Sequence, residues 1–149
     1  MKGMVFTEFL DMVELKFSAE MVDDIIEDSQ LPNGGAYTAV GTYDHAELVR
    51  MVESLAQRSG VPVPTLVHAF GPHLFGRFYA LYSDCFSGIP TALDFLEGIE
   101  VVIHTEVRKR YPDAQLPEFD CVRTASGLDM VYSSPRRDLP NGSMRFGMR

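Results

Sequence analysis

A histidine within a predicted helix is the first residue that could do chemistry. His104 lies one turn after Glu100 and one turn before Arg108, with apolar residues such as Ile103 and Val107 beside it. A neutral imidazole can bind a metal through one ring nitrogen while a hydrogen bond holds the other, and an apolar wall suits a flat hydrophobic cofactor. From position alone, however, the favoured interpretation is a half-buried histidine satisfied by a carbonyl or a carboxylate.

A second group of polar residues occurs at every other position near the C-terminus: Tyr132, Ser134 and Arg136. In an extended strand these side chains share one face, which aligns two hydroxyls with a guanidinium. Such a row suits a pair of flexible carboxylates, because Arg offers a bidentate charged fork and the hydroxyls fix the orientation. Taken alone, the row is better explained as the solvated face of an edge strand. Together, the two features fit a ligand with a metal, an apolar body and two carboxylates, which describes heme.

Helices are predicted for most of the first half of the chain. Apolar residues recur at steps of three and four from Val5 to Phe17, which is typical of an amphipathic helix. Ser18 can cap a second, short helix, and a turn-rich loop follows it. Asp44 lies three residues before Glu47, a spacing typical of a capping box, so a further helix should start there. Gly60 is placed to end this helix.

Two more helices are predicted before the sequence changes character. The first runs from about Pro64 to Tyr82, and Pro72 should kink or divide it because proline lacks a backbone donor. The second begins after a cap at Thr91 and ends before Pro112. This second helix carries His104.

The segment after Pro117 predicts a hairpin. Residues 119–134 are rich in β-branched and aromatic side chains around a Ser-Gly turn. Residues 138–149 show no sustained apolar period, so we expect an irregular tail. The predicted fold class is therefore α+β, with an N-terminal helical subdomain, a long histidine-bearing helix and a small C-terminal antiparallel sheet.

Composition limits the class of protein. The chain has 149 residues, 46% hydrophobic and 23% charged, which predicts one globular domain. A net charge of -8 argues against nucleic acid and anionic membranes as partners. Cys85 and Cys121 are too few for a disulfide framework or a zinc ribbon. Acidic residues interrupt the first seventeen positions, so no signal peptide or membrane span is expected there. We expect a soluble, cytoplasmic protein.

Several segments together resemble the heme-nitric oxide/oxygen binding domains, called H-NOX or HNOB. The resemblance covers residues 1 to about 137, and the histidine seven positions before a Tyr-Pro pair, followed by Tyr-x-Ser-x-Arg, is its most specific part. The matching segments are the MKG start, residues 43–55, FGPHLFGRF at 70–78, Tyr111 to Ala114, Pro117 with Phe119, and YSSPR at 132–136.

The resemblance implies a role for individual residues. His104 matches the proximal iron ligand of a heme b, Tyr132, Ser134 and Arg136 match the motif that holds the propionates, and Pro117 matches a proline that presses on the porphyrin. Residues on the distal side or the heme periphery would be Met1, Val5, Phe9, Leu74 and Phe78. None of these five side chains offers a hydrogen-bond donor. Distal polarity controls which gas binds, so an apolar wall implies selectivity for nitric oxide, with carbon monoxide as a further possible ligand.

The same resemblance implies a gas sensor and not an enzyme. Nitric oxide would weaken the bond between iron and His104, and the N-terminal helices would shift against the part that carries the heme. Bacterial members of this length usually act on a separate histidine kinase or a cyclic-dinucleotide enzyme. Family domains continue past Arg137 for roughly one-fifth of a domain, so residues 1–137 are expected to form a C-terminally incomplete H-NOX domain.

Two alternatives remain open from the sequence. The first is an interaction module with the H-NOX shape that binds no heme, because its C-terminal cover is absent. The second is an enzyme, with Cys85 near His68 or His73 as a thiol-imidazole pair, or with a metal at residues 44–47, which include His45. A buried inert thiol and helix capping explain these residues more simply.

Overall fold

The computed structural model describes residues 1–134 and 142–147, and for 142–147 only the backbone. The chain divides into two compact units, Met1–Leu81 and Tyr82–Arg149, which we call the N-terminal unit and the C-terminal unit. The sequence alone predicted one domain, because no Gly- or Pro-rich linker marks the division at residue 81. Each unit is described by itself below.

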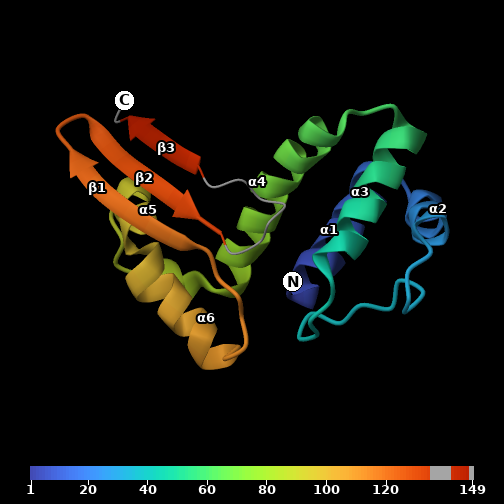
Figure 1. Ribbon diagram of the computed structural model, residues 1–149, viewed down its shortest axis with the longest axis horizontal. Coiled ribbons are helices and arrows are strands. Elements are labelled where there is room, and N and C mark those ends of the chain that lie inside the picture. The colour runs from blue at the N-terminus through green and yellow to red at the C-terminus, as the bar shows by residue number, and fades with distance from the viewer. Residues whose placement is uncertain (135–141, 148–149) are drawn as a thin grey trace. The chain divides into compact units, whose positions relative to one another are not determined.

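The N-terminal unit contains four helices, α1 (Gly3–Lys16), α2 (Ala19–Ser29), α3 (His45–Ser59) and α4 (Val63–Leu81) (Figure 1). The predicted caps are confirmed. The Ser18 hydroxyl accepts the backbone N–H of Met21 at 3.1 Å, and the Asp44 carboxylate accepts that of Ala46 at 3.0 Å. Gly60 ends α3 in the left-handed region at φ 72°, where a residue without a Cβ carries no steric penalty.

Helix α4 differs from its prediction. Pro72 lies in its interior, yet the helix is assigned without interruption over 19 residues. Proline removes one backbone hydrogen bond and crowds the preceding turn, so it usually kinks or ends a helix. Here α4 packs against α1 and α3, and packing of this kind can hold a helix together across a proline. Of the two expected outcomes, division of the helix at Pro72 is therefore wrong, and a kink there stays a prediction.

Aromatic packing dominates the interior of the N-terminal unit. The ring of Phe6 stacks on Tyr37 with centroids 4.5 Å apart and meets the edge of Tyr43 at 5.5 Å. Phe9 of α1 meets Phe70 of α4 edge to face at 5.6 Å. The buried cluster consists of Phe6, Phe9, Met12, Val13, Ile25, Leu31, Met51, Leu55 and Leu66. It draws on all four helices, so it fixes their arrangement within this unit.

The helical part of the C-terminal unit is less regular than expected. It comprises the short 3-10 helix η1 (Ser83–Phe86), α5 (Ala92–Gly98), the π-helical segment η2 (Ile99–Ile103) and α6 (His104–Arg110). The predicted cap at Thr91 is confirmed, since its hydroxyl accepts the backbone N–H of Asp94 at 3.2 Å. The single helix predicted here is thus a continuous helical run with a wide turn in its middle.

Three antiparallel strands complete the C-terminal unit in the order β1 (Glu118–Thr124), β2 (Gly127–Ser133) and β3 (Gly142–Gly147). The predicted β1–β2 hairpin is confirmed. The predicted irregular tail is wrong for the six residues of β3, which pair with β2 from Gly127↔Gly147 to Tyr132↔Gly142. Its apolar alternation is limited to Met144 and Phe146, which is too short to predict a strand, so the pairing partner reveals it.

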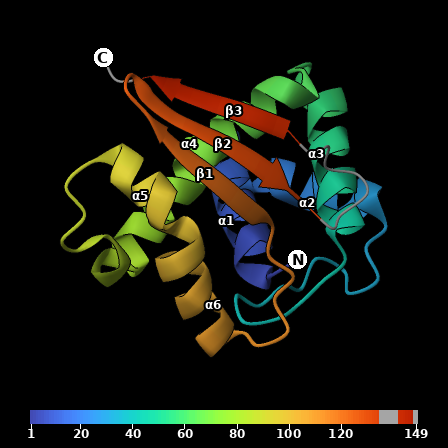
Figure 2. The same cartoon turned by 60° about the vertical axis from the view of Figure 1, so that its left-hand side comes forward.

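The helical run contacts the sheet, α5 against β2 and η2 against β1, as Figure 2 allows the reader to follow. Leu128 and Met130 of β2 are almost fully buried, whereas Val122 and Val131 are exposed on the sheet. Alternation of this kind gives the sheet one covered face and one open face. Among the described residues, no helix is long and apolar enough to cross a membrane.

Candidate functional site

His104 is the first residue of α6 and directly follows the π-helical segment η2. The residue is only 6% exposed, which is unusual for a histidine on a short helix. π-Helical turns occur frequently at functional sites, because they shift the direction of the side chains that follow. The fold therefore places this imidazole in the interior and at an irregular point of the backbone.

A carboxylate one turn earlier faces the imidazole. Nδ1 of His104 lies 3.1 Å from Oε1 of Glu100, which is within ion-pair distance, although the contact lacks hydrogen-bond angles. Nδ1 is buried and has no hydrogen-bond partner among the described residues. The same Oε1 accepts the backbone N–H of Phe119 at 2.8 Å. One carboxylate oxygen thus lies between the imidazole and the start of β1.

Successive ring contacts connect the histidine to two aromatic residues of the sheet, Phe119 and Tyr132. The centroid of the Phe119 ring is 5.6 Å from that of His104, and 5.5 Å from that of Tyr132. Phe119 and Tyr132 are directly opposite each other in the β1–β2 register. His104 and Tyr132 therefore both contact the ring of Phe119, although 27 residues lie between them in the chain.

The predicted row of three donors is only partly described. Tyr132 lies in β2, but the strand ends at Ser133, so Ser134 follows it as irregular backbone. The expectation that one strand carries all three is therefore wrong at Ser134. Arg136 lies outside the described residues. Pro117 is half-buried just before β1, two positions from Phe119.

An ion-pair network fixes α5 against β1. Arg123 of β1 reaches Asp94 at 2.5 Å and Glu97 at 2.7 Å. The hydrogen bond from Thr91, together with Arg123, lowers the pKa of Asp94 below its usual range. Burial, and then the nearby carboxylates, raise the pKa of the Cys121 thiol, which lowers the fraction of reactive thiolate.

The five residues expected on the distal side all belong to the N-terminal unit. Phe9 is 1% exposed within the buried cluster, while Val5 of α1 and Leu74 and Phe78 of α4 are half-buried. The α-ammonium group of Met1 donates to the Tyr43 carbonyl at 2.5 Å. Their expected role at a heme stays a prediction.

Sequence reasoning assigned no role to two residues of the site, Glu100 and Phe119. The spacing of four between Glu100 and His104 already places both on one helix face, so this pair could have been found. Phe119 carries no local signal for its contact with the imidazole, because that contact depends on how the sheet packs on the helix.

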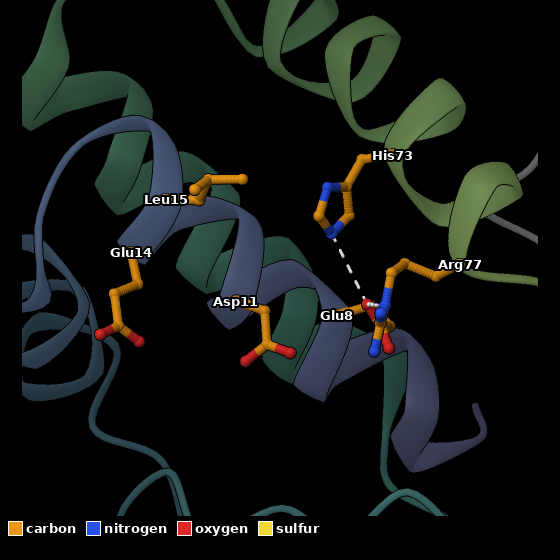
Figure 3. Close-up of a pocket in the computed structure, with 6 residues that line it drawn as sticks. All are labelled: Glu8, Asp11, Glu14, Leu15, His73 and Arg77. Atoms are coloured by element: carbon orange, nitrogen blue, oxygen red, sulfur yellow. Dashed lines mark hydrogen bonds and ion pairs between the residues drawn. The ribbon is translucent and has the colours of Figure 1, made fainter. Parts of the chain in front are cut away.

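A second polar cluster lies within the N-terminal unit (Figure 3). Glu8 of α1 is buried, and its Oε2 accepts a hydrogen bond from Nε of Arg77 at 2.9 Å. Nε2 of His73 is 3.6 Å from the same oxygen. Asp11 and Glu14 continue along α1 beside an open pocket. The cluster joins α1 to α4 by charge, next to the aromatic packing of the same two helices.

The residues considered for an enzyme have other partners. Asp44 caps α3, and Glu47 accepts the Tyr37 hydroxyl at 2.8 Å. Burial and this hydrogen bond raise the pKa of Tyr37 far above its usual value. Within residues 1–134 and 142–147, no group of three or more His, Cys, Asp or Glu could hold a metal ion. Cys85 lies in η1 of the C-terminal unit, whereas His68 and His73 lie on α4.

Comparison with known proteins decides the family. The sequence profile of the Haem-NO-binding family, HNOB, matches residues 2–144. The chain belongs to this family. The resemblance inferred from the sequence is thereby confirmed, and so is the α+β fold class.

Solved H-NOX structures agree with this assignment. An Fe(II) unliganded H-NOX protein from K. algicida is 41% identical, with a TM-score of 0.84 over 91% of this chain and 74% of that chain. An H-NOX protein from S. oneidensis in the Fe(II)NO state is 30% identical, with a TM-score of 0.83 over 92% and 76%. An H-NOX protein from Shewanella woodyi in the Fe(II)CO state is 39% identical, with a TM-score of 0.81 over 91% and 72%. These neighbours support assignment of the chain to the heme-based gas sensors, which are not enzymes as a family.

A further similarity concerns a different class of protein. UDP-N-acetylmuramate–L-alanine ligases from Neisseria gonorrhoeae and Neisseria meningitidis are 30% identical over 113 residues. The match takes in 76% of this chain, and the chain spans about a quarter of the length of those ligases. No ligase activity follows from a match to so small a part of an enzyme.

Proposed function

We propose that this protein senses nitric oxide through a heme b whose iron is bound by His104. The observation that carries the proposal is the buried imidazole of His104 with a carboxylate at its Nδ1, in a chain of the Haem-NO-binding family. When bound, the heme supplies the iron at which a diatomic gas coordinates.

The residues of the C-terminal unit fit such a group. Metal-bound histidines usually direct their second ring nitrogen at a carboxylate or a carbonyl, which sets the ring orientation. Here Glu100 stands at Nδ1 of His104, so Nε2 is the nitrogen that would face iron. The rings of Phe119 and Tyr132 add aromatic surface of the kind that a flat macrocycle packs against.

We assign the propionates to Tyr132, Ser134 and Arg136, and the porphyrin contact to Pro117. Two hydroxyls and a guanidinium can hold two carboxylates by charge-assisted hydrogen bonds. The ring of Phe119 contacts both Tyr132 and His104, which supports a role for Tyr132 in the same site. The other two follow it closely in the chain.

We assign the gas-binding side to Met1, Val5, Phe9, Leu74 and Phe78. Bound oxygen is stabilised by distal hydrogen-bond donors, and these side chains carry none. The proposal therefore favours nitric oxide, with carbon monoxide as a second ligand, over oxygen.

Signalling then requires two conformations that differ in affinity for the gas. We propose that the N-terminal helices shift between these two conformations, relative to the part that would carry the heme at His104. The receiving partner would be a separate histidine kinase or cyclic-dinucleotide enzyme, as the similarity to the Haem-NO-binding family implies.

Absorption spectra of the purified chain test the proposal. With hemin and reductant, the wild type should show a Soret band that moves when nitric oxide is added. His104→Gly should lose heme unless free imidazole is supplied, because imidazole can replace the missing ligand. His68→Gly, on exposed surface of α4, serves as the matched control and should keep the wild-type spectrum.

Two results would contradict the proposal. A wild type that stays colourless after heme addition would favour the heme-free interaction module. A His104→Gly spectrum identical to the wild type would assign the iron to another ligand.

A further inference from the structure

We propose that Glu100 is a positioning residue that fixes the ring of His104 and links it to the start of β1. The inference deepens the proposed function and rests on it, because positioning serves a metal only if His104 binds one. Glu100 itself would contact neither the heme nor the gas.

The first observation concerns the imidazole. Nδ1 of His104 is buried, and the charged group facing it is the Glu100 carboxylate at 3.1 Å. The contact lacks hydrogen-bond angles, but a proton on Nδ1 would bring positive charge close to this oxygen, whereas a bare Nδ1 would bring its lone pair close to it. A carboxylate at Nδ1 therefore favours the tautomer with the proton on Nδ1, which leaves the lone pair on Nε2. That is the form a metal needs.

The second observation concerns the backbone of the sheet. Oε1 of Glu100, the oxygen nearest to Nδ1, also accepts the Phe119 N–H at 2.8 Å. Phe119 in turn packs its ring against His104. A displacement of the imidazole would therefore alter the hydrogen bond that holds the second residue of β1.

The third observation is the setting of the carboxylate. Glu100 lies in the π-helical segment η2, and its side chain is 28% exposed. Arg108 approaches its other oxygen, Oε2, only at 4.0 Å. Oε1 thus accepts the Phe119 N–H and faces Nδ1, whereas Arg108 approaches the other carboxylate oxygen.

The neighbouring carboxylate Glu97 provides a matched control. It lies three positions earlier and also bonds β1, but through the side chain of Arg123 at 2.7 Å. Removing Glu97 breaks a link between helix and strand without removing the carboxylate at the imidazole. The two changes separate positioning of His104 from general loss of packing.

The decisive experiment uses the heme-free, full-length protein. Long-range ¹⁵N–¹H NMR spectra at pH about 8, above the usual pKa of imidazole, report the tautomer of His104. We expect the wild type to carry the proton on Nδ1. Glu100→Ala should move the ring toward the Nε2 tautomer and shift the amide signal of Phe119. Glu100→Gln keeps an amide oxygen and should retain much of the wild-type pattern, while Glu97→Ala should leave the tautomer unchanged.

A second measurement uses the heme-loaded ferrous protein. An acceptor at Nδ1 makes the imidazole a stronger ligand, so Glu100→Ala should lower the iron–histidine stretching frequency in resonance Raman spectra. Loss of a partner of this kind typically weakens metal binding by about 10- to 100-fold. Heme should therefore leave Glu100→Ala at least about tenfold faster than it leaves Glu97→Ala.

The outcomes distinguish the two proposals. If His104 keeps its tautomer and its iron–histidine frequency in both Glu100 variants, Glu100 is not a positioning residue. If the wild type binds no heme but the His104 tautomer still changes in Glu100→Ala, the proposed function fails and the positioning role of Glu100 stands. If Glu100→Ala does not fold, Glu100→Met takes its place, because methionine keeps the length of the side chain without an oxygen acceptor, and a tautomer that stays on Nδ1 in that variant overturns the proposal.

Discussion

The two units use their interiors differently. In the N-terminal unit, the buried cluster is apolar and includes residues of every helix. Within it, Phe6 contacts the rings of both Tyr37 and Tyr43. In the described part of the C-terminal unit, the fully buried apolar side chains are Leu128 and Met130, and a histidine is buried as well. Val101 and Val122 are more than half exposed. The first interior provides stability, and the second holds the histidine that we propose as the iron ligand, so substitutions in the two units should differ in kind.

The largest expected effect is on the stability of the N-terminal unit. Phe6→Ala removes a fully buried ring and should lower the free energy of unfolding by about 3–5 kcal/mol. Urea unfolding followed by circular dichroism measures the change. Leu15→Ala on the same helix is the control, because Leu15 is 73% exposed and should cost less than about 0.5 kcal/mol. Equal losses in the two variants would contradict the assignment of this cluster as the main core.

The charged cluster of Figure 3 should show a smaller effect. Arg77→Met leaves the buried Glu8 carboxylate without its close partner, which should cost about 1–3 kcal/mol. The lower part of this range is expected because Arg77 is half exposed and therefore screened by water. The double variant Glu8→Leu with Arg77→Met should recover much of the loss. Strictly additive losses would show that the two side chains do not interact.

In the C-terminal unit, the expected change is in the site and not in stability. Phe119→Leu keeps an apolar side chain between His104 and Tyr132, so unfolding should change by less than about 1.5 kcal/mol. The ring contact is lost, and heme, if bound as proposed, should leave faster and show a shifted Soret band. Thermal unfolding and heme transfer to an acceptor protein measure the two effects. A Phe119→Leu variant that loses stability without any change in heme release or in the Soret band would contradict this contrast between the two units.

The smallest effect concerns an exposed ion pair on α2 and α3. Hydrogen bonds from Arg58, and then from Ser54, lower the pKa of Asp28 from 3.8 to about 2. A depressed carboxyl pKa adds stability above the unfolded value, and this contribution is lost as the pH falls from 3.8 toward about 2. Asp28→Asn should therefore narrow the difference in stability between neutral and acidic solution. Urea midpoints across this pH range measure it, and an unchanged pH profile would show that the pair contributes nothing.

The parts of the fold that sequence predicts well depend on contacts close in the chain. The caps at Ser18, Asp44 and Thr91 are confirmed because each side chain bonds a backbone N–H two or three residues later. The hairpin of β1 and β2 follows from alternation around a tight turn. His104 and the propionate motif taken together indicated heme, but the role of each residue was implied by the resemblance, since neither feature alone is specific for heme.

The parts that sequence misses depend on distant partners. β3 has only one short apolar alternation, Met144 and Phe146, and is recognised as a strand by its pairing with β2. α4 continues through Pro72, which propensity alone argues against. The segment from Ile99 to Ile103 has no feature that separates a π turn from an α turn. For the site, the spacing of Glu100 and His104 was visible, but the bond to the Phe119 backbone was not.

The wide turn before His104 has a consequence for how this chain tolerates insertions and deletions. A π turn accommodates one more residue than an α turn, and π turns are typically single-turn bulges within an α-helix. Deleting Val101, which is exposed, would allow the run to close into a regular helix. Because the α turn would complete nearly the same rotation with one residue fewer, the helix on either side would keep its phase and the imidazole its direction toward Phe119. We therefore expect the site to tolerate the loss of one residue at this turn.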